Sequence, residues 1–168
     1  MIILKKLYKL ILKKEPPYYY NYSLLQILKK PFVKHINVVI IPNIPFNCVR
    51  IALYRAIGYR IGKHTFIGMK CYLDDLCKDK INIGNNVTIS YGVYVACHGK
   101  NQGHNTLTIN DGAYIGMRAN IVARKSNGIV VGKNAIIGAC TLVNDDVPDN
   151  ATVVGVPMRI IRKEIAND

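Results

Sequence analysis

The sequence lacks several features that mark common classes of protein. Its five cysteines form no Cys-x-x-Cys pair, and an odd number of cysteines without a signal peptide favours a reducing compartment. The amino-terminal stretch MIILKKLYKLILKK has no uninterrupted apolar run and no small-residue cleavage site. We therefore expect neither a secretory signal nor a membrane span, and a cytoplasmic location.

Acidic residues are scarce, and their scarcity is uneven along the chain. Residues 1–60 contain eleven Lys and Arg but only one acid, Glu15, whereas residues 61–168 contain twelve Lys and Arg and nine acids. A basic chain favours a partner such as nucleic acid, anionic lipid or an anionic small molecule. Because the excess belongs to the first sixty residues, we expect contact with an anionic membrane and no nucleic acid.

Residues 1–60 are predicted to form a basic, mainly helical segment. On a helical wheel Lys5, Lys6, Lys9 and Lys13 share one face and aliphatic side chains share the other. Such a helix suits the inner face of a membrane, or it packs on the rest of the protein, and both interpretations stay open. Further helices are predicted at 23–30, with Ser23 and Gln26 as a capping box, and at 46–58, with Asn47 as N-cap.

Residues 61–168 follow a six-residue rhythm. Blocks such as IGKHTF, IGMKCY and IGNNVT open with Ile, Leu or Val, and their fifth residue is small or β-branched. This period predicts three short strands per coil, with the aliphatic residue inward and with Gly or Asn accommodating awkward turn angles. Stacked coils share a continuous core. The predicted fold class is therefore an all-β solenoid, a parallel β-helix preceded by a helical segment.

Three insertions interrupt the rhythm, each after the third block of a set. They comprise residues 79–82, 101–108 and 127–130, so all of them fall at one corner of a three-sided coil. The longest insertion follows VACHGK and places His98 at its start and His104 within it. Because loops on a rigid scaffold commonly carry function, this loop is the candidate site.

The stretches ISYGVYVACHGK, INDGAYIGMRANIV and VGKNAIIGACTLVNDDVPDNATVVGVPMRII resemble the left-handed β-helix acetyltransferases. The resemblance covers about residues 61–163 and is closest to the sugar and capsular-polysaccharide O-acetyltransferases of that family. It implies a left-handed coil, acetyl-CoA as co-substrate, and a homotrimer with active sites between subunits.

The resemblance also implies a general base in the corner loop, which deprotonates an acceptor hydroxyl that attacks the acetyl thioester directly. His98 matches this base approximately, since galactoside-type members carry it about two residues later, and His104 resembles a second histidine of serine-type members. The alternative is a pair of locally bonded loop histidines. Cys97 could be nucleophilic, but a packed small side chain is the favoured interpretation. Asp74 and Asp75 are candidates for binding the acceptor hydroxyl.

In the family, backbone groups of the late coils hold the pantetheine arm and basic residues meet the phosphates. By motif, the resemblance assigns these cofactor-binding roles to Met117, Ala139, Asn144, Arg159 and Arg162, and Arg118 and Lys163 are further candidates for the phosphates. Galactoside-type members have Thr-Lys where this chain has Asn144-Asp145, so Lys163, Arg118 or Arg124 would have to replace the lost lysine. The alternative for Arg159 and Arg162 is a solvated basic tail.

The predicted function is transfer of an acetyl group from acetyl-CoA to a sugar hydroxyl in surface polysaccharide biosynthesis. A serine-type or other small-molecule acceptor is the first alternative, although the large helical amino-terminal domain of serine acetyltransferases has no counterpart in the sequence. A γ-carbonic-anhydrase-like lyase is the second, but its zinc needs three histidines and the solenoid has only His64, His98 and His104, so we expect no metal. A non-catalytic scaffold is the third.

Overall fold

The computed structural model describes residues 8–14, 24–98, 104–123 and 127–163. The chain divides into two compact units, residues 1–36 and 37–168. In the first unit, residues 8–12 are helical, and the predicted second helix is found as α2 (Leu24–His35). Residues 1–7 and Ser23, on which the amphipathic face and the capping box partly depend, lie outside the described residues. In the part of the chain that is described, no helix is both long and apolar enough to cross a bilayer.

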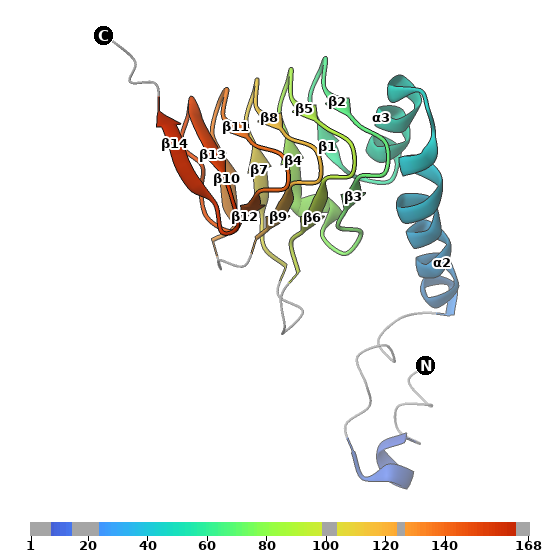
Figure 1. Cartoon of the computed structure of the whole chain (residues 1–168). Coiled ribbons are helices and arrows are strands. Elements are labelled where there is room, and N and C mark those ends of the chain that lie inside the picture. Colours follow the sequence, from blue (N-terminus) through green and yellow to red (C-terminus); the bar gives the residue numbers. More distant parts are fainter. Residues whose placement is uncertain (1–7, 15–23, 99–103, 124–126, 164–168) are drawn as a thin grey trace. The chain divides into compact units, whose positions relative to one another are not determined.

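The second unit is a three-sided solenoid preceded by short helical elements (Figure 1). The helical elements are the π-helical turn η2 (Ile36–Ile40), which begins at the unit boundary, the 3₁₀ turn η3 (Ile41–Asn43) and the helix α3 (Asn47–Ala56). The first two coils contain β1 (Arg60–Ile61), β2 (Phe66–Ile67), β3 (Tyr72–Leu73), the 3₁₀ turn η4 (Lys78–Lys80), β4 (Ile81–Ile83), β5 (Thr88–Ile89) and β6 (Tyr94–Ala96). The later coils contain β7 (Leu107–Ile109), β8 (Tyr114–Ile115), β9 (Asn120–Val122), β10 (Ile129–Val131), β11 (Ile136–Ile137), β12 (Leu142–Val143), β13 (Ala151–Val154) and β14 (Arg159–Lys163).

Strands of successive coils stack into three sheets. Sheet A has the order β1-β4-β7-β10, sheet B the order β14-β13-β11-β8-β5-β2 and sheet C the order β12-β9-β6-β3. All pairs are parallel except β13 with β14. Tyr72 pairs with Tyr94, and Tyr94 pairs with Asn120, so the longest insertion, the second of the three, does not shift the register of sheet C. The predicted fold class, a parallel β-helix with a helical amino-terminal segment, is confirmed.

The interior consists of the two columns that the rhythm predicts. The first position of each block is buried in every described coil except at Ile61, which is half-buried at the open end. The fifth position is buried in every block where the structure describes it; these residues are Thr65, Cys71, Cys77, Val87, Val93, Ala113, Ala119, Ala135, Thr141 and Val147. Each coil therefore covers its neighbour's apolar surface, as in other repeat proteins.

Two different constraints act at the corners, where the rhythm predicts only one, the awkward angle of the turn. The awkward backbone angle falls on the fourth position of a block, where His64, Arg118 and Cys140 all have φ values between 55° and 57°. The second position requires glycine for a different reason, because the next coil leaves no space for a side chain. A Cβ on Gly62 would lie 2.4 Å from the carbonyl oxygen of Gly84 in the next coil. Close stacking of the coils, rather than a left-handed angle, therefore requires glycine there.

Side chains from residues 37–59 cover the open edge of the first coil. The Asn47 amide donates to the carbonyl oxygen of Thr65 at 3.1 Å and accepts the N–H of Ile67 at 3.0 Å, so it replaces a missing strand beside β2. Asn47 is not the N-cap of α3, which corrects the prediction. Phe46 occupies that position without a capping side chain.

Side chains also donate hydrogen bonds to the other carbonyl groups at the open edge of the first coil. Arg50, 1% exposed, donates from Nε and Nη2 to the carbonyl oxygen of Ile67 at 2.9 and 2.6 Å. Asn37 and Tyr59 each donate to the carbonyl oxygen of Leu73 at 2.9 Å. Because unpaired strand edges are costly when they are buried, these contacts explain why the compact unit begins at residue 37.

Arg50→Met should unfold the solenoid at a lower urea concentration than the wild type. The variant keeps most of the side-chain volume but leaves the carbonyl oxygen of Ile67 without its donor, and we expect a loss of about 3 kcal/mol in the free energy of unfolding. Arg60→Ala is the control, since Arg60 is exposed and should change stability by less than about 0.5 kcal/mol. Equal midpoints for the two variants, at one protein concentration, would contradict the capping role.

Candidate functional site

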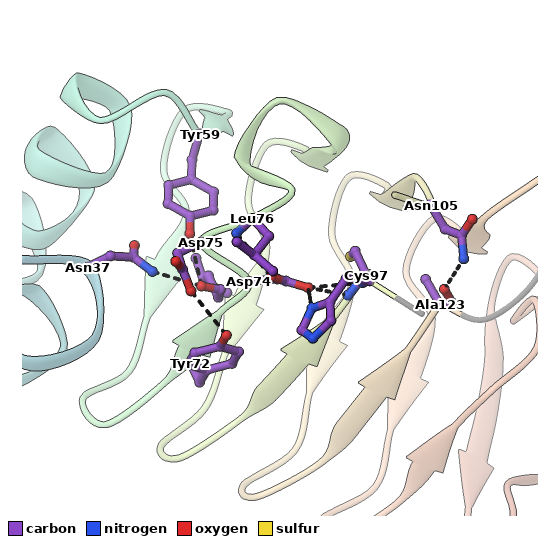
Figure 2. Close-up of polar contacts among 11 residues, drawn as sticks. Asn37, Tyr59, Tyr72, Asp74, Asp75, Leu76, Cys97, Asn105 and Ala123 are labelled. Carbon is purple, nitrogen blue, oxygen red and sulfur yellow. Dashed lines mark hydrogen bonds and ion pairs between the residues drawn. The ribbon is translucent and has the colours of Figure 1, made fainter. Parts of the chain in front are cut away.

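The site begins with a buried carboxylate. Asp74 follows β3 and is 0% exposed. Its Oδ2 accepts the backbone N–H groups of Cys97 at 2.7 Å and His98 at 3.1 Å, and its Oδ1 accepts the N–H of Leu76 at 3.1 Å (Figure 2). Three backbone donors thus compensate for the loss of water around the carboxylate.

The same carboxylate holds the side chain of His98. Nδ1 of His98 lies 2.6 Å from Oδ2 of Asp74, while 36% of the histidine side chain remains exposed. Burial raises the pKa of Asp74, but the hydrogen bonds from Cys97 and His98 outweigh it and hold the pKa below its usual range. Because an ionised carboxylate only accepts, Nδ1 carries the hydrogen and the lone pair of Nε2 is left to take a proton.

The two histidines of the corner loop lie opposite each other. His98 and His104 form an isolated antiparallel bridge, and the N–H of Asn105 donates to the carbonyl oxygen of Cys97 at 2.8 Å. Asn105 also donates from Nδ2 to the carbonyl oxygen of Ala123 at 2.6 Å, which ties the returning segment to the next coil (Figure 2). Both histidines are therefore brought to the base of the insertion, while residues 99–103 lie outside the described part of the chain.

Cys97 is placed as the favoured interpretation expected. Its side chain is buried, all five cysteines are free, and burial together with the nearby charge of Asp74 raises its pKa to about 12. A thiol with such a pKa is protonated near neutral pH and cannot serve as a nucleophile. The small side chain packs inside the coil instead.

The two aspartates predicted to bind the acceptor differ in position. Asp74 is fully buried and both of its oxygens are occupied, so the structure places it behind the histidine rather than against an acceptor. This corrects the prediction for Asp74. Asp75 is half-buried and accepts the Tyr72 hydroxyl through Oδ1 at 3.2 Å. Asp75 therefore keeps its acceptor role as a prediction.

A stacked tyrosine pair beside these aspartates was missed in the sequence. The rings of Tyr72 and Tyr94 are 4.5 Å apart between centroids and 14° from parallel. The signal was present, because both residues occupy the sixth position of the second block in consecutive coils, IGMKCY and ISYGVY. The stacking register places such positions side by side.

The residues predicted to hold coenzyme A divide between two corners. Met117, Arg118 and Ala139 are exposed where sheet B turns into sheet C, and the N–H of Cys140 donates to the carbonyl oxygen of Met117 at 2.9 Å. Arg159 is exposed at the start of β14. The side chains of Arg162 and Lys163, and all of Arg124, lie outside the described residues.

Asn144 lies at the other end of sheet C. It is exposed after β12, at the corner where His98 follows β6 two coils earlier. His64 lies on a different corner, between β1 and β2. In the described ranges, no three His, Cys, Asp or Glu residues come close enough to hold a metal ion.

Comparison with known sequences relates the chain to acetyltransferases. No family model matches the sequence. Serine acetyltransferases of Bacillus licheniformis and Bacillus subtilis are each 40% identical over 106 residues, which cover 62% of this chain and 45% of theirs. The chain thus spans less than half the length of these relatives. YvoF of Bacillus subtilis, named as a candidate acetyltransferase, is 32% identical over 145 residues, and the match covers 78% of each chain.

Solved structures show the same coil. The maltose O-acetyltransferase of Clostridium difficile 630 is 26% identical and has a TM-score of 0.66. The match covers 90% of this chain and 94% of the other. A hexapeptide-repeat acetyltransferase of Vibrio cholerae, solved in complex with acetyl coenzyme A, also has a TM-score of 0.66 at 23% identity, with coverage of 94% of this chain and 97% of its own. At 23% identity, the similarity to the Vibrio cholerae protein supports the fold alone. YvoF matches over most of both chains, and the solved acetyltransferases share the coil built from six-residue repeats. The chain therefore belongs to the hexapeptide-repeat acetyltransferase family.

Proposed function

We propose that the protein transfers an acetyl group from acetyl-CoA to a hydroxyl group of a sugar. The observation that carries the proposal is the imidazole of His98, held at Nδ1 by the buried Asp74 and still exposed at the start of the corner loop. An oriented histidine with a free nitrogen is suited to remove a proton from a hydroxyl. In a chain of this family, that proton belongs to the acceptor.

The residues of the chain supply proton transfer and orientation. Nε2 of His98 takes the acceptor proton as the hydroxyl oxygen becomes nucleophilic, and the negative charge of Asp74 stabilises the imidazolium that forms. Acetyl-CoA supplies the thioester carbonyl carbon that the oxygen attacks. His98 then returns the proton to the sulfur of the departing thiolate. Because the Cys97 thiol is buried and protonated, the chain forms no acetyl-enzyme.

The exposed residues along sheet C fit a long, flexible co-substrate. Met117 and Ala139 lie at the corner before sheet C and Arg159 begins β14 of sheet B, whereas His98 lies at the corner after sheet C. Strands of two or three residues separate these corners by on the order of 10 Å. We infer that the pantetheine arm follows this face, with Arg118 and Arg159 near the phosphates in place of the missing lysine.

Two acceptor classes are supported by the comparisons. The 40% identity to serine acetyltransferases supports a free hydroxyl amino acid. The match to a maltose O-acetyltransferase over nearly the whole of both chains supports a sugar, which we favour. An assay of thiol release from acetyl-CoA, across a panel of sugars, oligosaccharides and L-serine, distinguishes the two. Turnover of serine alone would overturn the sugar assignment.

The same proposal extends to the oligomeric state, the acceptor and the location of the protein. We infer a homotrimer in which neighbouring subunits complete each site, as the resemblance to the hexapeptide-repeat acetyltransferases implies. Sedimentation equilibrium tests this assembly. The acceptor we favour is a surface polysaccharide or its lipid-linked precursor, which suits a protein held peripherally at the inner face of a membrane.

His98→Ala should lower turnover by roughly 10²–10⁴-fold, the usual contribution of a positioned general base. The affinity for acetyl-CoA should change little, because the base meets the acceptor hydroxyl. Both constants come from initial rates of thiol release.

Three further variants test the role of His98. Cys97→Ala should keep most of the activity, and Asp74→Asn should lower turnover because it removes the charge that orients and stabilises the imidazolium. His104→Ala identifies the base. If it abolishes turnover while His98→Ala does not, His104 is the base, and if neither variant loses activity the loop contains no base.

Arg159→Ala combined with Arg162→Ala should raise the KM for acetyl-CoA more than the KM for the acceptor. The expected increase is about tenfold, as for the loss of one or two charged hydrogen bonds to phosphate. Equal effects on both substrates would remove these arginines from the coenzyme site.

Deletion of residues 1–14 should leave the solenoid folded but weaken cosedimentation with vesicles that contain anionic lipid. The deleted stretch carries five lysines, each worth about 1 kcal/mol near such a surface. Circular dichroism checks the fold, and vesicles of neutral lipid are the control. Failure of the intact chain to bind anionic vesicles at low salt would end the membrane proposal.

A further inference from the structure

We propose that Tyr72, Tyr94 and Asp75 form an acceptor subsite that binds a neutral sugar ring through its apolar face. The inference rests on the proposed function and deepens it, because it assigns the acceptor a surface of its own on the outside of sheet C. It also separates the two acceptor classes by the chemistry of that surface.

The tyrosine pair forms an aromatic stack on rigid strands, in which each ring covers one face of the other. Tyr72 on β3 and Tyr94 on β6 are partners in the parallel ladder, and their rings stack at 4.5 Å and 14°. Both side chains point away from the core, since their neighbours Leu73 and Val95 are buried. Tyr94 is 42% exposed although it lies in a regular strand. The outer face of Tyr94, on the side of Asn120, is therefore the face offered to a ligand ring, and little freedom of this stacked side chain remains to be lost on binding.

Polar groups surround this surface in the way that a sugar requires. The Oδ1 of Asp75 accepts the Tyr72 hydroxyl at 3.2 Å, and the half-buried carboxylate has a second oxygen to accept a sugar hydroxyl. Asn120, the partner of Tyr94 in the next coil, is exposed and presents an amide. A pyranose ring has one apolar C–H face and a rim of hydroxyls, so it matches an aromatic face flanked by acceptors.

The subsite is connected to the base by short covalent paths. Asp75 follows Asp74, which holds His98, and Tyr94 precedes His98 by four residues on the same side of the coil. Four extended residues span about 13 Å. An acceptor of more than one ring would therefore rest on the tyrosines while a hydroxyl of its next ring approaches Nε2.

The charge of this surface disfavours a free amino acid. Along sheet C the outward row of described residues reads Tyr72, Tyr94, Asn120 and Leu142, with no cation among them. This row offers no cationic partner for the carboxylate of a free serine, and Asp75 would meet only its ammonium group. A neutral glycoside needs no such cationic partner.

The test measures sugar binding directly, by saturation-transfer NMR titration of maltose, lactose and cellobiose in the presence of CoA. Tyr94→Ala should weaken the Kd of the disaccharide that binds by at least about fivefold, which corresponds to the usual worth of an aromatic contact. Tyr94→Phe keeps the ring and should stay within about twofold of the wild type. Tyr114→Ala is the matched control, since Tyr114 is 44% exposed on the outer face of sheet B.

Several results would overturn the subsite. One is a wild-type chain that binds none of the three disaccharides, and another is a Tyr94→Ala variant that binds as the wild type does while its thermal midpoint is unchanged. Tighter binding of L-serine than of any disaccharide would also refute it. A chain that binds a disaccharide through Tyr94 but gives no thermal shift with acetyl-CoA would support the subsite and overturn the proposed function.

Discussion

The structure depends on the hydrogen bonds between one coil and the next. Each strand is only two to five residues long and has no stable partner within its own coil, so its backbone groups must be met by the coils on either side. At the first coil there is no preceding strand, and Asn47, Arg50, Tyr59 and Asn37 take its place with side-chain donors and acceptors. At the other end β14 turns back on β13, which ends the parallel stacking.

The candidate site uses the same stacking for a different purpose. Asp74 follows a strand of the first coil and His98 follows the strand that pairs with it in the second, so the ladder that aligns Tyr72 with Tyr94 also brings the carboxylate to the imidazole. In each regular block the inward residues pack in the core and the corner residues form the turns. The proposed base therefore lies where the rhythm breaks, and the second insertion leaves the register of sheet C undisturbed.

Sequence reasoning located the histidines but not what surrounds them. The sequence shows a corner loop that interrupts a strict rhythm, with one histidine at its start and another within it. The role of Asp74 was not visible, because DD in LDDLCK gives no sign of which carboxylate points inward. Burial and three backbone donors decide it. Asn47 shows the same limit, since a residue before a helix is a good N-cap by propensity, and only the open edge of β2 gives its amide a better partner.

The sequence by itself determined the coil, its inward columns and the corner from which the loop departs, because a six-residue period fixes which residues face inward whatever lies next to them. The tertiary structure alone decided which residue holds His98, why glycine stands in the second position, and that Tyr72 and Tyr94 stack. Each of these depends on contact between residues of successive coils, which are far apart in the chain, and such contacts exist only once the coils have stacked.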